Sequence, residues 1–241
     1  MGFYGMYLDP TYMVIFVVTL IISLGAQMYV KSAYGKWSKV PNSNNLTGLQ
    51  VGQILLQRTG LGVTYQAAYG KGVQFQGIGG QLTDHYDPSK HVVGLSQGVA
   101  TQASVASMAI VAHELGHAQQ HAQHSPLIAM RNFLVPAVRF SPMLSYALIF
   151  MGLIFNITGL FYLGILVFGL MVLFSIITLP VEIDASRRGI KLLNEAGLMV
   201  NTSDAQGSKN VLTAAATTYI AAAITAVLQL LYYLSIANRR R

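Results

Sequence analysis

The chain has 241 residues, of which 53% are apolar and only 10% are charged, a composition typical of membrane proteins rather than soluble ones. It contains no cysteine, which excludes disulfides, thiolate metal sites and a cysteine nucleophile, so any bound metal must be held by His, Asp or Glu. The net charge of +7 comes from basic residues grouped beside apolar runs, which indicates membrane orientation and not nucleic-acid binding.

Four apolar runs predict helices that are long enough to cross or lie in a bilayer. They span residues 11–30, 133–155, 160–179 and 213–237. The first run is uncharged over its 20 residues and no Lys or Arg precedes it, which favours a retained anchor over a cleaved signal peptide. Only NITG separates the second and third runs, so they should form a transmembrane hairpin.

The polar stretch between the first two runs predicts a small water-facing domain. A helix is expected over LTGLQVGQILLQRTG, with Thr47 as its N-cap and Gly60 as its stop. The glycine-rich alternation in residues 62–80 predicts two short strands, and HVVGLS predicts a third. A longer helix should follow over residues 103–122.

The domain order follows from these elements. We expect an anchor in residues 1–30, a water-facing domain in 31–125, the hairpin in 126–181, a polar segment in 182–212 and a C-terminal helix with a basic tail in 213–241.

The stretch HELGH is the feature with the clearest chemical meaning. Residues four apart on a helix point the same way, so His113 and His117 can present two imidazoles to one metal ion, with Glu114 beside them as a general base. Such a site suits Zn²⁺. The helix is too short and too polar to span a bilayer, which argues against an intramembrane protease.

A catalytic zinc ion needs a third protein ligand. The metzincin pattern is excluded because Gln120 and Gln123 replace its glycine and histidine. His121 lies about 12 Å along the helix axis from His113, too far to share one ion. We therefore expect His121 and His124 to be exposed polar residues.

A glutamate from a later helix is the remaining source of a third ligand. The chain has only three Glu residues. Glu182 is favoured because it follows an apolar run, where an unpaired carboxylate is costly, whereas Glu195 lies beside a predicted helix stop. Asp184 is the alternative. Because the hairpin crosses the membrane twice, Glu182 can return to the side of His113.

The basic residues predict which side this is. Those flanking the runs favour a cytoplasmic site in a multi-pass bacterial membrane protein, although the C-terminal arginines would then lie on the other side if the last run crosses fully. These basic residues are Lys31, Lys36, Lys39, Arg131, Arg187, Arg188 and Lys191.

Three segments together resemble the bacterial YugP-like putative neutral zinc metallopeptidases, over nearly the whole chain. They are HELGH, LTDHYDPSKHVVGLS and PVEIDASRR. The chain is more distantly similar to the membrane gluzincins of the HtpX and CaaX-protease type, whose third ligand is the Glu of an ExxAD motif. The resemblance places that Glu on Glu182 and the Ala on Ala185. It also places Ser186 where the family has Asp, so Asp184 and Asp84 are candidates to replace that residue.

The resemblance implies a mostly α membrane protein with a small α+β zincin-like domain, acting as a gluzincin-type zinc endopeptidase near the membrane surface. Its substrate would be a membrane-associated protein or peptide, and a homo-oligomer or a regulatory membrane partner is possible. Asp84, His85, Tyr86, Asp184 and Arg187 are candidates for orienting ligands or stabilising the transition state.

Two alternatives stay open at this stage. His91 to Ser96 could be an edge strand that holds substrate, or Asp84 and Asp87 could simply build a turn. The protein could also be a nonenzymatic scaffold with a structural zinc ion, if Asp184 or His85 supplied a fourth ligand.

Overall fold

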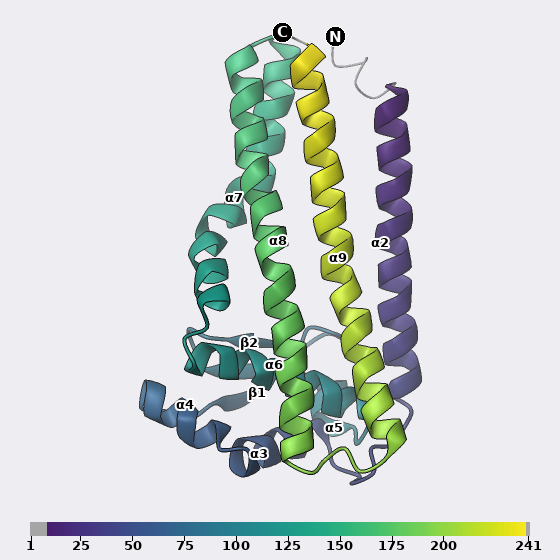
Figure 1. The fold of residues 1–241 in the computed structure, drawn as a ribbon, viewed down its shortest axis with the longest axis vertical. Coiled ribbons are helices and arrows are strands. Elements are labelled where there is room, and N and C mark those ends of the chain that lie inside the picture. Colours follow the sequence, from purple (N-terminus) through teal and green to yellow (C-terminus); the bar gives the residue numbers. More distant parts are fainter. Residues whose placement is uncertain (1–8, 240–241) are drawn as a thin grey trace. The chain divides into compact units, whose positions relative to one another are not determined.

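The computed structural model describes residues 9–239 (Figure 1). Within these residues the protein is mostly helical and has one small sheet, which confirms the prediction of a mostly α protein with a short sheet. In chain order the elements are α2 (Pro10–Trp37), α3 (Gly48–Arg58), α4 (Leu61–Tyr69), β1 (Gln74–Ile78), β2 (His85–Asp87), β3 (Val92–Ser96), α5 (Gln97–Thr101), α6 (Val105–Ala122), α7 (Pro126–Ile154), α8 (Thr158–Glu195) and α9 (Thr202–Arg239).

Helices α2, α7, α8 and α9 are each long and apolar enough to cross a membrane, as the four apolar runs predicted. The main difference from the prediction lies in α8. The run expected to end at Leu179 continues through Pro180 as one 38-residue helix that ends at Glu195. The predicted span and the segment containing Glu182 are therefore parts of a single helix.

The described chain forms two compact units. The membrane unit comprises residues 9–27, 130–180 and 217–239, and the α/β unit comprises Met28–Ala129 and Val181–Ala216. Helices α2, α7, α8 and α9 each contribute residues to both units. The predicted division into five segments stays a prediction.

The membrane unit is apolar inside and outside. Phe161, Phe168 and Tyr233 belong to its buried core. By contrast, Phe133 and Met143 on α7 are exposed by 82% and 84%, a pattern that suits a lipid environment and not water.

The start of α2 and the end of α9 meet within this unit. Arg239 Nη1 lies 3.1 Å from the carboxylate of Asp9. This ion pair compensates one of the C-terminal charges that conflicted with the predicted orientation.

The α/β unit begins with the helix expected from sequence. The Thr47 side chain accepts a hydrogen bond from the Gln50 backbone, and the Gln50 side chain accepts one from the Thr47 backbone, which forms a complete capping box for α3. Gly60 follows in the left-handed conformation (φ 69°) and separates α3 from α4. A strand was predicted over the next residues, but they form α4. The prediction was wrong because the Tyr65 side chain is fully buried in the core from a helix and not from a strand.

The sheet has the order β1-β3-β2. Strand β3 is parallel to β1 and antiparallel to β2, and Val93 and Leu95 on it are buried. The predicted third strand is thus present, but it is the central strand and not an edge. Its backbone pairs with neighbours on both sides, so the hypothesis that it holds substrate by strand addition was wrong.

Candidate metal centre

Helix α6 places the HELGH residues inside the α/β unit. Ser104 caps the helix by accepting a hydrogen bond from the Ser107 backbone at 3.1 Å. Most of its 18 residues are buried, including Val111 and Leu115, so α6 is a core helix of this unit. This burial fixes the direction in which His113 and His117 point.

The small residues of α6 and α8 explain how the two helices approach so closely. A Cβ atom on Gly116 would collide with the carbonyl group of Ala185. Likewise, a Cβ on Gly189 would lie 2.8 Å from the carbonyl carbon and oxygen of Ala112. The Gly in HELGH and the Ala and Gly of α8 therefore allow backbone contact that brings Glu182 to the two histidines.

Three donor atoms converge at this crossing. The Nε2 atoms of His113 and His117 lie 3.3 and 3.4 Å from the same oxygen, Oε2 of Glu182. The three side chains are only 13%, 10% and 3% exposed. Two ligands that each lie about 2 Å from a tetrahedral zinc ion are about 3.3 Å apart, so the spacing fits one such ion.

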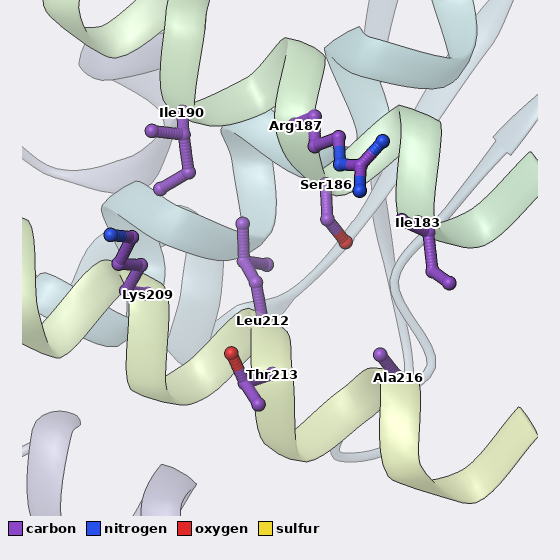
Figure 2. Close-up of a pocket in the computed structure, with 8 residues that line it drawn as sticks. All are labelled: Ile183, Ser186, Arg187, Ile190, Lys209, Leu212, Thr213 and Ala216. Carbon is purple, nitrogen blue, oxygen red and sulfur yellow. The ribbon is translucent and has the colours of Figure 1, made fainter. Parts of the chain in front are cut away.

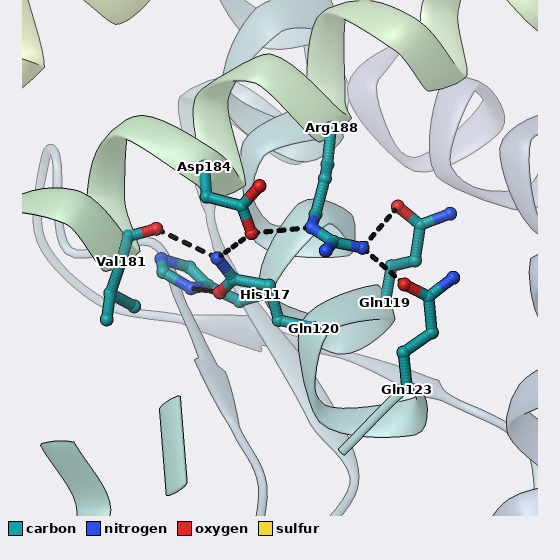
Figure 3. A network of polar contacts seen from close by, with 7 residues as sticks. All are labelled: His117, Gln119, Gln120, Gln123, Val181, Asp184 and Arg188. Atoms are coloured by element: carbon teal, nitrogen blue, oxygen red, sulfur yellow. Dashed lines mark hydrogen bonds and ion pairs between the residues drawn. The ribbon is translucent and has the colours of Figure 1, made fainter. Parts of the chain in front are cut away.

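A hydrogen-bond network determines how the imidazole of His117 is oriented (Figure 3). Gln120, which is fully buried, directs its Nε2 to Val181 O at 2.9 Å and to Asp184 Oδ2 at 2.7 Å. Both partners can only accept, so the amide oxygen of Gln120 must face His117 Nδ1, at 3.0 Å. His117 Nδ1 then donates, and its Nε2 presents a lone pair toward Glu182.

This arrangement favours a cation. A bare imidazole lone pair facing a carboxylate is repulsive unless a positive charge lies between them. Burial lowers the pKa of His117, but the neighbouring carboxylates of Glu182 and Glu114 outweigh burial and raise that pKa above its ordinary value, which shows that the site favours a positive charge. The chemistry of the donor set therefore fits a divalent metal ion such as zinc.

The other members of the network extend it across α8. Arg188 Nε donates to Asp184 Oδ2 at 2.6 Å, and Arg188 Nη1 contacts Gln119 at 3.3 Å and Gln123 at 2.6 Å (Figure 3). Asp184 thus supports His117 indirectly, through Gln120. Ser186 lies 3.1 Å from Nδ1 of His113. Each candidate imidazole ligand consequently has a side-chain partner on its second nitrogen.

Gln120 and Ser186 were the residues that sequence reasoning missed. In the sequence, Gln120 served only to exclude the metzincin pattern, and Ser186 was noted only because it differs from the Asp of the ExxAD motif. A signal for Gln120 existed, since a polar residue three positions after His117 falls on the same helix face. Asp184 was a candidate for orienting a ligand, but nothing in the sequence indicated that its contact would be with Gln120.

Glu114, the predicted general base, is next to His113 on α6 and is 7% exposed. Within the described residues, one group of His, Asp or Glu side chains is close enough to share a metal ion, and it consists of His113, His117 and Glu182. The metal and catalytic roles of these residues stay predictions that this geometry supports.

The LTDHYDP segment has mostly structural contacts. Asp84 accepts hydrogen bonds from the backbone and hydroxyl of Ser96, at 2.7 and 3.0 Å, which ties it to the end of β3. Asp87 accepts from the Ser89 backbone at 2.9 Å, as in a turn. His85 is exposed, and its Nδ1 lies 2.9 Å from the Thr83 carbonyl. The structure gives none of these three a contact with the candidate ligands, and their predicted roles stay untested.

Tyr86 belongs to a second group, which we call the tyrosine–histidine cluster: Tyr65, Tyr69, Tyr86, His91 and His121. The Tyr65 hydroxyl bonds to that of Tyr86 and lies 2.6 Å from His91 Nδ1. The Tyr86 hydroxyl lies 2.8 Å from His121 Nδ1, and the Tyr69 ring stacks on the His121 ring at 4.6 Å. His121 was expected to be exposed, but this packing leaves it half-buried, whereas His124 is exposed as predicted.

Comparison with known proteins agrees with this geometry. The model of the putative neutral zinc metallopeptidase family matches residues 12–238. The chain belongs to this family. A relative described as putative membrane protease YugP, from Bacillus subtilis (strain 168), is 36% identical over 220 residues, which cover 91% of this chain and 93% of that protein. No solved structure matches the chain.

Membership in this family implies zinc and a peptide substrate, and the four apolar helices mark a membrane protein. The resemblance noted from HELGH, LTDHYDP and PVEIDASRR is thereby confirmed at the level of the family.

Proposed function

We propose that this family member is a membrane-bound zinc endopeptidase that hydrolyses peptide bonds near the membrane surface. The observation that carries the proposal is the convergence of His113 and His117 Nε2 on one oxygen of Glu182, in the spacing that a zinc ion needs. These three residues would hold the ion. When bound, zinc acidifies a water molecule and polarises the substrate carbonyl.

Glu114 is the general base in this proposal. It takes a proton from the attacking water and later delivers that proton to the leaving amine. Because the Glu114 side chain is largely buried, its charge interacts with the attacking water with little screening by solvent. The groups behind the ligands, Gln120 and Ser186, keep the two imidazoles oriented while the substrate binds and leaves.

A purely structural zinc site is the competing proposal, and the position of its possible fourth ligands argues against it. The Asp184 carboxylate is engaged by Gln120 and Arg188, and His85 is exposed with a hydrogen bond to Thr83. With three protein ligands, a position remains for water, as catalysis requires.

The location of the site suggests the substrate. The part of α8 that belongs to the membrane unit ends at Pro180, and Glu182 follows two residues later. We propose that the substrates are membrane-associated proteins or peptides. The basic residues near the site favour the cytoplasmic side of a bacterial cell membrane.

The deciding experiment compares the purified full-length protein with its Glu114→Gln variant. Wild type should contain zinc and digest an unfolded test protein, and chelation followed by zinc should remove and restore the digestion. Glu114→Gln should keep zinc but lose about 100-fold or more of the activity. Zinc without digestion in wild type would instead support the structural role.

A further inference from the structure

Helices α8 and α9 border a groove of about 370 Å³ within the α/β unit (Figure 2). Its wall is mainly apolar, with side chains from both helices: Ile183, Ile190, Leu212 and Ala216. A concave apolar pocket of this volume lies at the lower end of the range for ligand sites in proteins. It suits one or two side chains of an extended peptide better than a folded partner.

The groove adjoins the candidate metal centre through Ser186. Ser186 lines the groove, and its hydroxyl lies 3.1 Å from Nδ1 of His113. At 3.6 residues per turn, Ser186 is about 40° around α8 from Glu182, and Ile183 is about 100° from it. The faces of α8 that line the metal centre and the groove are therefore neighbours.

Two cations give the groove a charge preference. Arg187 and Lys209 line it from opposite helices, and both side chains are exposed. No acidic residue lines the groove, and neither cation forms an ion pair within the described part of the chain. An occupant with an apolar body and a nearby negative charge would complement both features.

We propose that this groove is the substrate subsite beside the cleavage point, and that it selects a large apolar side chain with an Asp or Glu close to it in the peptide. The inference rests on the proposed function, because a peptide bond held at the metal would place an adjacent side chain beside Ser186. A phospholipid could also satisfy the apolar wall and the cations. A phospholipid, however, would not explain why Ser186, which lines the groove, also contacts the candidate metal ligand His113.

The first test changes the size of the groove. Full-length protein would be given a peptide library, in which wild type should prefer Leu, Met or Phe over Ala at one position. Ala216→Phe should lower that preference ratio at least about tenfold, since pocket contacts of a few methylenes discriminate by this much. Thr213→Leu offers a milder filling of the same groove, and Gln206→Leu on the same helix, outside the groove, is the control.

The second test reverses the charge. Arg187→Glu and Lys209→Glu should each lower the preference for a neighbouring Asp or Glu by about two- to fivefold, the size expected of exposed ion pairs. Lys191→Glu is the matched control, because Lys191 lies on α8 near Arg187, is exposed and pairs with Glu195 instead of lining the groove.

A binding measurement separates this inference from the proposed function. Zinc-loaded Glu114→Gln protein should bind a fluorescent peptide containing Leu and Glu at least about tenfold more tightly than the same peptide with Ser and Gln, and Ala216→Phe should remove the difference. If this holds while wild type cleaves nothing, the subsite stands and the peptidase function fails.

Two results would overturn the subsite. One is a wild-type peptidase whose preferences and peptide binding are unchanged by Ala216→Phe, Thr213→Leu and both charge reversals. The other is a phospholipid that copurifies with wild type and is displaced by Ala216→Phe, with no change in peptide selection.

Discussion

The candidate metal centre and the tyrosine–histidine cluster both use imidazoles of helix α6, four residues apart. In the metal centre, His117 donates from Nδ1 to Gln120 and turns Nε2 to a carboxylate. In the cluster, His121 turns Nδ1 to the Tyr86 hydroxyl, and no carboxylate belongs to the group. Carboxylates raise the pKa of His117, whereas burial and the nearby His91 and His124 lower the pKa of His121.

The difference shows that carboxylate placement, and not histidine density, separates a cation site from a structural cluster. The hydroxyls of Tyr65 and Tyr86 supply two protons for the three hydrogen bonds that join them to each other, to His91 and to His121, so one imidazole can supply the third proton from its own nitrogen. The cluster is satisfied without a metal. We therefore expect changes in the metal centre to affect zinc, and changes in the cluster to affect stability.

Removal of the carboxylate should have the largest effect. Glu182→Ala should reduce zinc affinity by more than the roughly 10–100-fold that supporting partners contribute, because it deletes a ligand. Metal analysis of purified protein after dialysis measures this loss. Glu195→Ala on the same helix is the control, since Glu195 forms an exposed pair with Lys191. Full zinc content in Glu182→Ala would refute the ligand assignment.

The support behind His117 should matter next. Gln120→Met keeps the volume of the side chain but removes three hydrogen bonds, so zinc affinity should fall about 10–100-fold. Gln123→Met is the control, because Gln123 is exposed and its side chain contacts Arg188. Competition with a calibrated chelator gives the affinities. Equal affinities in the two variants would show that Gln120 does not orient the ligand.

In the cluster, Tyr65→Phe should affect stability alone. It removes a buried hydroxyl that bonds to Tyr86 and His91, which should cost about 1–3 kcal/mol. For a chain of this size, each kcal/mol lowers the melting temperature by about 2–4 °C. Zinc content should not change. Tyr34→Phe is a control with a half-buried ring, and a loss of zinc in Tyr65→Phe would contradict the separation of the two regions.

The smallest expected effect is a dependence of stability on pH. Partial burial and Lys71 lower the pKa of His91 below its ordinary value of 6.5. Above pH 6.5 both states are neutral at this residue, but below it the unfolded chain binds the proton first, so stability falls as the pH falls toward the folded-state pKa.

Melting temperatures at pH 7.5 and 5.5 test this dependence. His91→Gln should show a smaller drop than wild type, because the variant lacks the group that titrates. The metal-ligand histidines are common to both proteins and cancel in the comparison. Identical drops would show that His91 makes no contribution.

Much of the fold and of the candidate site could be predicted from sequence, because local patterns encode it. Apolar runs of sufficient length indicated all four long helices, and Thr47 and Gly60 marked the ends of α3. The spacing of HELGH placed two imidazoles on one face, and the scarcity of Glu singled out Glu182. The errors occurred where packing overrides a local pattern. Tyr65 belongs to an alternating sequence that predicted a strand, but it lies on helix α4 with its side chain buried.

Composition and spacing along single helices were enough to identify the class of the protein, its apolar spans and the residues able to hold a metal ion. The side chains that support those residues could be identified only from the packing of the folded chain. The contacts from Gln120 to Asp184 and from Ser186 to His113 join positions more than 60 residues apart. They form because small residues let α6 and α8 touch along their backbones, a consequence of packing that no local pattern expresses.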